Sequence, residues 1–375
     1  MEPLSNIPAG MRYYFGREAR LRRAVEDGVM SVFDGWGYEE ITTPSVDYFA
    51  LFERGMGREE AGRCFRFTDA DGRLLALRPD VTSSVARAAA TLFAGTPRPL
   101  RFCYAASVFR QRTRSHAEWR RQERQLGCEL IGAGESGADV EVLAVAAEVL
   151  GRLGLGGSYR ITLNHVGVFN GVAAQLGLDA AAREQMRRHV DARDSAALEQ
   201  FVARLGRSGE TAARAGRLAR LAGGRGIPRE ALELLTNERS RAALAELESL
   251  WRVVESLNLC EGFSVDLSDV SGLDYYTGLV FKIYVEGRGA RVGSGGRYDE
   301  LTASFGRREP AVGFVLDLDA LTEALAHGGD FDSKNGERRA DPIGGTQDTA
   351  GRFREARRRR AQGERIQMNF EAEDR

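Results

Sequence analysis

Hydrophobic side chains recur at every third or fourth position over residues 18–33, and this spacing predicts an amphipathic helix. A glycine-rich turn follows, and YEEITTPSV at 38–46 alternates apolar and polar residues like a strand that runs into Pro44. The stretch CFRFTDADGRLLALRPDV predicts two strands around a DADG turn, and the second leads into a helix that begins near Thr82. A helix and a strand therefore open the predicted fold, and a hairpin and a second helix continue it.

Two longer apolar stretches, LRFCYAASVFRQ and RRQERQLGCELIG, predict a second pair of strands joined by a polar, arginine-rich loop. A helix rich in alanine, valine and leucine is expected at 140–153, and a strand at SYRITLN. Strands paired directly in this way indicate an antiparallel sheet, because a doubly wound sheet would alternate strands and helices throughout. We therefore predict a fold of the α+β class.

The central part of the chain changes from strands to helices and back. Residues 166–257 are almost wholly helical in pattern, with breaks at glycine and proline, and we interpret them as a helical insertion. Strand character returns at GFSVDLSDV, GLVFKIYVE and ARVGSGG, and a last strand and helix are expected at AVGFVLDLDALTEALA. Residues 1–165 and 258–328 are therefore predicted to form the first and second parts of one core.

Residues 329–375 differ from the rest because they are polar, charged and poor in aliphatic side chains. Such a segment cannot bury enough apolar surface to offset the entropy lost on ordering, so we predict a disordered tail. Its RRRR run is interpreted as a solvated group of charges, and contact with nucleic acid or an acidic partner is the alternative.

The composition is that of an ordinary globular protein. The chain has 375 residues, 43% of them hydrophobic, with 53 basic and 54 acidic side chains and a net charge of −1, so it lacks the basic excess of a dedicated nucleic-acid binder. Its four cysteines lie far apart, away from the histidines and without CxxC spacing, so we expect no metal site and no disulfide. We find no signal-peptide pattern and no apolar run of about 18 residues, and we therefore expect a cytoplasmic protein without membrane spans.

Four separated stretches of the sequence are informative when they are taken together and in their order along the chain. They are LRPDVTSSVAR, then VFR with RRQERQLGCELIG, then GLDYYTGLVF, and last GSGGRYDEL with AVGFVLDLDAL. In order and approximate spacing they resemble the catalytic core of the histidyl-tRNA synthetases, and the resemblance covers residues 7–325. It includes GYEEITTPSVDYF, which is similar to the class II dimerisation motif. The resemblance implies a class II synthetase-like core, an antiparallel sheet flanked by helices, with a helical insertion.

The resemblance also implies a site for free histidine. The amino acid carries an ammonium, a carboxylate and an imidazole, so its site needs carboxylates, a cation and polar or aromatic groups around the ring. Asp80, Glu129 and Arg110 supply these charges. The candidate histidine-binding residues, all from the stretches quoted above, are Asp80, Thr82, Arg110, Gln125, Glu129, Tyr275, Tyr276 and Tyr298.

The similarity assigns roles within this set. Asp80, Thr82 and Gln125 would hold the amino group, and Glu129 and Tyr276 would meet the imidazole. The remaining two tyrosines would line the walls. Each feature also has a structural explanation when taken alone, because Asp-x-Thr before a helix is usually a cap and a glycine-rich GSGGRY is usually a turn. The combination of the stretches is what indicates a binding site.

Several departures from the synthetase pattern concern ATP. Ser271 stands where the pattern has an arginine before GLDYYTG, and Ala320 stands where the last motif has an arginine that reaches ATP. Asp317 replaces a glycine, Arg112 replaces the usual glutamate of the arginine-rich loop, and Glu123 replaces the phenylalanine that would stack on adenine. Because losing one phosphate donor costs about 10²- to 10³-fold in rate, we expect no ATP-dependent activation.

A synthetase-like core with an amino-acid site but neither an ATP site nor a C-terminal anticodon-binding domain resembles the regulatory subunits of ATP phosphoribosyltransferase. That family implies a non-enzyme with no catalytic residue, cofactor or metal. The implied partners are a short-form catalytic subunit in a hetero-oligomer, a second copy of the chain as a homodimer, and L-histidine as an allosteric ligand in the first step of histidine biosynthesis. We expect neither a membrane nor a tRNA partner.

Two alternatives remain open. A true histidyl-tRNA synthetase would explain the same site, but it needs arginines at positions 271 and 320 and a folded C-terminal domain. Another synthetase paralogue, such as an amino-acid sensor or a protein-modifying ligase, shares the fold and could use ligand binding differently. A ligase would still need the ATP site that these substitutions remove.

Overall fold

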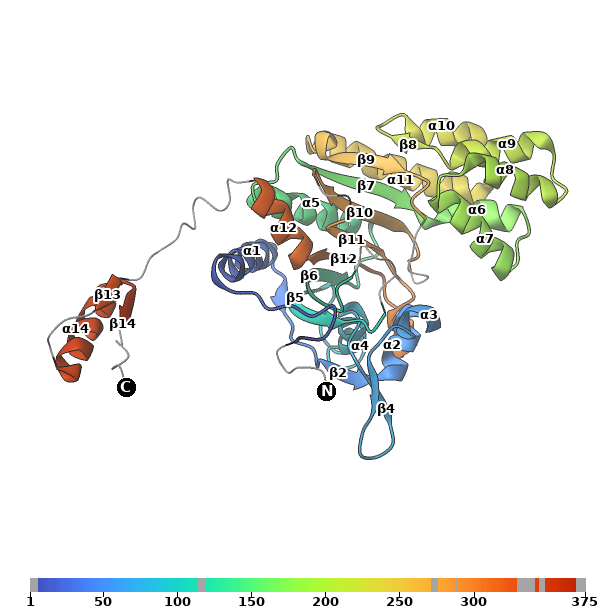
Figure 1. Cartoon of the computed structure of the whole chain (residues 1–375). Coiled ribbons are helices and arrows are strands. Elements are labelled where there is room, and N and C mark those ends of the chain that lie inside the picture. The colour runs from blue at the N-terminus through green and yellow to red at the C-terminus, as the bar shows by residue number, and fades with distance from the viewer. Residues whose placement is uncertain are drawn as a thin grey trace.

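The computed structural model describes residues 6–112, 119–270, 276–287, 289, 291–328, 341–343 and 348–368. Figure 1 shows a broad sheet with helices packed around it and a helical lobe at one end. Among the described residues, no helix combines the length and the apolar character that crossing a membrane requires.

A nine-stranded sheet forms the centre of the fold. Its order is β1(Glu39–Glu40), β5(Leu100–Phe109), β6(Gln122–Ile131), β12(Ala311–Asp317), β11(Gly293–Arg297), β10(Leu279–Val285), β7(Tyr159–His165), β9(Phe263–Asp266) and β8(Ala222–Gly223). Neighbours pair antiparallel except at β1–β5 and β7–β9, which are parallel. The predicted α+β class is confirmed. The sheet is mixed because the connections from β1 to β5 and from β7 to β9 run through helices.

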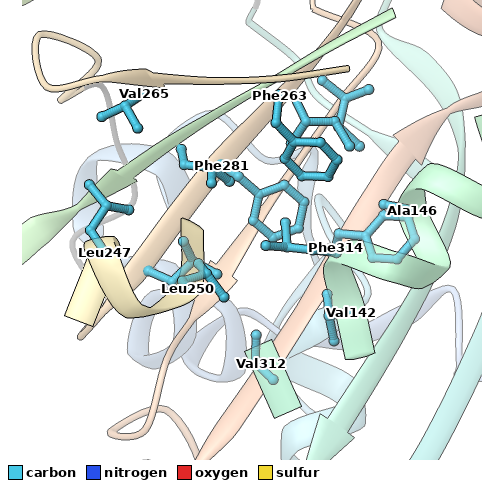
Figure 2. Packing of buried hydrophobic residues seen from close by; sticks show 14 of the residues in the cluster. Val142, Ala146, Leu247, Leu250, Phe263, Val265, Phe281, Val312 and Phe314 are labelled. Atoms are coloured by element: carbon cyan, nitrogen blue, oxygen red, sulfur yellow. The ribbon is translucent and has the colours of Figure 1, made fainter. Parts of the chain in front are cut away.

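One face of the sheet carries the main hydrophobic core. The helices that cover it are α1(Gly16–Gly35), α5(Ser136–Arg152) and α12(Leu318–Gly328), with α11(Glu238–Ser256) of the helical lobe beside them. Figure 2 shows Val142 of α5 near Phe314 of β12, and the Phe314 ring lies 6.3 Å from that of Phe281 on β10. Alternate strand residues point to this face, and their burial against the helices stabilises the sheet.

The opposite face of the sheet carries smaller elements. They are the helices α2(Phe49–Met56), α3(Arg58–Ala61) and α4(Thr82–Ala90), the three-stranded sheet β2(Val46–Tyr48), β4(Leu74–Leu77) and β3(Arg66–Thr68), and the 3₁₀ turn η2(Thr302–Phe305). Val81 and Val85 of this layer pack with Phe102 and Tyr104 of β5 in a second core cluster. This layer brings the amino end of α4 onto strand β6, where the candidate residues meet.

The segment interpreted as an insertion consists of six helices and the short strand β8. The helices are α6(Val166–Gln175), α7(Ala180–Asp191), α8(Ser195–Arg204), α9(Gly209–Leu218), α10(Ile227–Leu234) and α11(Glu238–Ser256), and the turn η1(Cys260–Gly262) leads back to the sheet. Five of them begin at capping side chains that accept backbone N–H groups of the first turn, and these are His165, Asp179, Asp194, Ser208 and Asn237.

The end of the chain differs from the predicted disorder where the structure describes it. β13(Asp341–Ile343) pairs in parallel with β14(Ile366–Met368), and α14(Thr349–Ala361) connects the two strands. Ile343 and Ala356 are buried in this unit, and Arg359 forms ion pairs with both Asp341 and Glu364. These contacts join residues far apart in sequence, so a composition argument does not detect them. The rest of 329–375 lies outside the described residues.

Candidate functional site

Glu129 lies at the centre of the candidate site, on strand β6. Its side chain is 2% exposed and accepts hydrogen bonds from three hydroxyl groups. Thr82 Oγ1 and the Tyr104 hydroxyl donate to Oε1 over 2.7 and 3.1 Å, and the Tyr298 hydroxyl donates to Oε2. Burial raises the pKa of Glu129 to about 7, although these hydroxyl groups act in the opposite direction. The three donors fix the orientation of the carboxylate.

Three glycines leave the space that Glu129 and its aromatic neighbours occupy. A Cβ atom on Gly313, the β12 partner of Glu129, would lie 1.9 Å from Glu129 Oε2. A Cβ on Gly127 would lie 2.5 Å from the Tyr104 hydroxyl, and one on Gly296 would lie 2.9 Å from the Tyr276 ring. Real Cβ atoms do not approach so closely, so any side chain at these positions would displace the site. The strand register places these glycines there.

Asp80 lies just before α4 and caps the helix. Its Oδ1 accepts the backbone N–H of Ser83 over 3.1 Å, and Oδ2 lies 3.5 Å from Ser83 Oγ. Burial raises the pKa of Asp80, and the bonds from Ser83 and the charge of Arg110 act against that rise. The structural explanation of the Asp-x-Thr motif therefore holds for Asp80, whereas Thr82 turns its hydroxyl to Glu129.

Arg110 follows strand β5, and its guanidinium group binds other residues of the chain. Its Nη1 donates to Glu123 Oε2 over 2.5 Å, and its Nη2 donates to the carbonyl oxygen of Pro79 over 3.0 Å. Glu123 occupies the position where the synthetase pattern has its adenine-stacking phenylalanine. The substitution therefore removes an aromatic surface and also neutralises a nearby arginine.

The remaining candidates are Gln125, Tyr276 and Tyr275, and the structure describes the first two of them. Gln125 is half-buried on β6, four residues from Glu129 and thus on the same face, between Ala106 of β5 and Asp317 of β12. Tyr276 is partly buried and packs against the core cluster that contains Tyr298. Tyr275 lies outside the described residues. The structure thus brings Thr82, Glu129, Tyr276 and Tyr298 together, with Asp80, Gln125 and Arg110 on neighbouring positions of the same side.

The region that corresponds to the last synthetase motif is acidic. Asp317 ends β12 and its Oδ1 accepts the backbone N–H of Ala320 over 3.1 Å. Burial and the charges of Glu123 and Asp319 raise the pKa of Asp317 to about 7. Asp319 is buried and pairs with Arg22 over 2.5 Å. Ala320 is buried, and Ser271 lies outside the described residues.

Sequence reasoning missed Tyr104, Gly127 and Gly313. Tyr104 lies in an ordinary apolar strand, and neither glycine belongs to a glycine-rich stretch. The signal that finds them is strand register, because Tyr104 faces Gly127 across β5 and β6 while Gly313 faces Glu129. In the part of the chain that the structure describes, no three histidine, cysteine or acidic side chains gather closely enough to hold a metal ion.

Comparison with known proteins gives a consistent result. The model of the histidyl-tRNA synthetase family matches residues 10–321. A protein of Moorella thermoacetica named ATP phosphoribosyltransferase regulatory subunit is 38% identical over 84% of this chain and 80% of its own length. A protein of Symbiobacterium thermophilum with the same name is 38% identical over 98% of this chain and 91% of its own length.

Solved structures agree with these relatives. A crystal structure from Bacillus halodurans, described as an ATP phosphoribosyltransferase regulatory subunit/histidyl-tRNA synthetase, is 30% identical, with a TM-score of 0.87 over 100% of this chain and 95% of that one. A histidyl-tRNA synthetase from Nostoc is 21% identical, with a TM-score of 0.78 over 98% of this chain and 86% of that one, and supports the fold alone.

Proposed function

The chain belongs to the family of ATP phosphoribosyltransferase regulatory subunits, which share the histidyl-tRNA synthetase fold, and we propose that it activates a short-form catalytic subunit. A regulatory role in histidine biosynthesis and a complex with a catalytic partner follow from the names of these relatives. We further propose that histidine, bound around Glu129, mediates feedback inhibition of the first step of that pathway. Such regulation requires only that the ligand bind two assembly states with different affinity.

The observation that carries this proposal is the contrast between two neighbouring regions. The polar groups around Glu129 are buried, ordered by hydrogen bonds and suited to an amine and an imidazole. The adjacent phosphate-facing region has Arg110 bound to Glu123 and carries Asp317 and Ala320 in place of glycine and arginine. This contrast supports ligand binding without ATP chemistry. It also disfavours the two alternatives, a synthetase and a ligase, since both consume ATP.

Replacing Glu129 with alanine is expected to weaken histidine binding by at least about tenfold, because a buried polar ligand would lose a charged acceptor. Titration calorimetry on the purified chain and on its complex with the catalytic subunit measures this effect. Glu141→Ala serves as the control, because Glu141 pairs with Arg101 on the opposite face of the sheet. Circular dichroism would establish that both variants fold. Equal histidine affinity of wild type and Glu129→Ala would refute the assignment of the site.

We also propose that the chain forms a homodimer through the small sheet β2–β4–β3. Tyr48 and Phe67 both pair with Leu75 and therefore share one face, on which they are 46% and 43% exposed. Val46, two residues before Tyr48, adds a third exposed apolar side chain to this face. An isologous contact would bury the same surface on each copy.

Light scattering at micromolar concentration is expected to give twice the mass of the chain, and a heavier species after the catalytic subunit is added. The double variant Tyr48→Glu/Phe67→Glu should be monomeric, because it places charges in the proposed contact. Leu92→Glu is the control, because Leu92 is 82% exposed and lies outside this sheet. A wild-type chain of monomeric mass would contradict the proposal.

A further inference from the structure

We propose that the site around Glu129 recognises the amine and the imidazole of its ligand, and that the residues described around it offer no cation to a ligand carboxylate. Imidazole amines without a carboxylate, such as L-histidinamide, would then bind at least as tightly as histidine. This inference rests on the proposed histidine site and specifies which groups of the ligand the site recognises.

The first observation is the number of carboxylates on this face. Glu123 and Glu129 lie on the same side of β6, because they are six residues apart in a strand. Asp317 is the β12 partner of Gln125, so its side chain points to this side as well. Asp80 lies at the start of α4, next to Thr82, which contacts Glu129. These four acidic side chains make the site favourable for an ammonium group.

The second observation is the state of the nearby arginines. Arg110, whose charge acts on Asp80, is bound by Glu123 over 2.5 Å. Arg120, whose charge acts on Asp317, is paired with Glu323 of α12. Arg78, from the stretch that contains Asp80, is buried and donates to the carbonyl oxygens of Thr43 and Ser107. Position 271, where the synthetase pattern has a further arginine, is a serine and carries no charge.

Binding of a ligand carboxylate at this site is expected to be unfavourable. A carboxylate placed among like charges without a cation is destabilised, and the desolvation of the ion adds to that cost. Recruiting Arg110 would not remedy this, because Glu123 would then be left as an unpaired, half-buried anion. A ligand whose carboxylate is replaced by a neutral amide avoids the conflict and keeps the ammonium and the imidazole.

Titration calorimetry near neutral pH compares three compounds, L-histidine, L-histidinamide and imidazole-propionate, which lacks the amine. The amide is expected to bind between equally and about tenfold more tightly than histidine, because one like-charge contact changes a binding constant by about that factor. Imidazole-propionate is expected to bind at least about a hundredfold more weakly, because it keeps the carboxylate and loses the ammonium.

A variant tests the cause of the preference. Glu123→Gln removes the negative charge that neutralises Arg110, so the ratio of histidine to histidinamide affinity should rise by about tenfold. The matched control is Glu141→Gln, which removes one carboxylate from the Arg101–Glu141 pair on the other face and should leave the ratio unchanged. An unchanged ratio in Glu123→Gln would overturn the inference.

The failure of this inference and that of the proposed site have different signatures. If wild-type protein binds histidine and binds the amide more weakly than histidine, a cation pairs with the carboxylate, so the inference is wrong while the histidine site stands. If the chain and its complex bind neither compound, the site assignment fails and the inference fails with it.

Discussion

The purified chain is expected to show no histidine-dependent exchange between ATP and pyrophosphate. That exchange requires cations placed around the ATP phosphates before the reaction begins. Here Arg110 is bound to Glu123, and the position of the last-motif arginine is the buried Ala320. The remaining arginine position is Ser271. Each such donor is worth about 10²- to 10³-fold in rate, so their joint loss exceeds about 10⁴-fold.

The added acidic groups reinforce this expectation. Asp317 and Glu123 stand close enough for the charge of Glu123 to raise the pKa of Asp317, which indicates a region unfavourable for a triphosphate. The assay follows labelled pyrophosphate entering ATP with and without histidine, and a histidyl-tRNA synthetase in parallel provides the positive control. Exchange by this chain at a rate near that of the control would mean that other groups supply the missing cations.

The core and the centre of the site were predictable from the sequence for a physical reason. Strand alternation and helix periodicity are local signals, and they place the residues before α4 and along β6 on recognisable elements. The stretches around Thr82, Glu129 and Tyr298 carry polar side chains where apolar ones would otherwise fill a core strand or helix. The structure brings these three residues together through direct hydrogen bonds to Glu129.

The pairing of Arg110 with Glu123 was not predictable from the sequence. The two residues lie 13 positions apart, on either side of an arginine-rich loop with several other candidates for each charge. Only the register of the hairpin, in which Val108 faces Glu123, decides which arginine meets which carboxylate. The same holds for Tyr104 and Gly127, whose role depends on what faces them across the sheet.

The C-terminal unit escaped prediction for a related reason. Its strands, β13 and β14, have three residues each and pair in parallel, so neither shows the alternation that marks a longer strand. The helix between them is rich in arginine, and Arg359 of this helix pairs with Asp341 and Glu364, which both lie outside it. Composition alone indicated a solvated chain.

We propose that this chain acts through a catalytic partner. The pairing of Arg110 with Glu123 and the hydrogen bond from Thr82 to Glu129 support this proposal, in which the partner supplies the chemistry and this chain binds the regulatory ligand. Regulation then depends on a ligand that biases the equilibrium between assembly states, and a coupling free energy of about 1–3 kcal/mol between two sites changes binding affinity by roughly five- to 150-fold.

The most direct measurement is the formation of phosphoribosyl-ATP by a short-form ATP phosphoribosyltransferase, alone and mixed with this chain, each with and without histidine. Adding the chain is expected to raise the rate by at least about tenfold, and histidine is expected to inhibit the mixture much more strongly than the catalytic subunit alone. A catalytic subunit that is equally active without the chain, and responds to histidine identically in both cases, would contradict the proposed regulatory role.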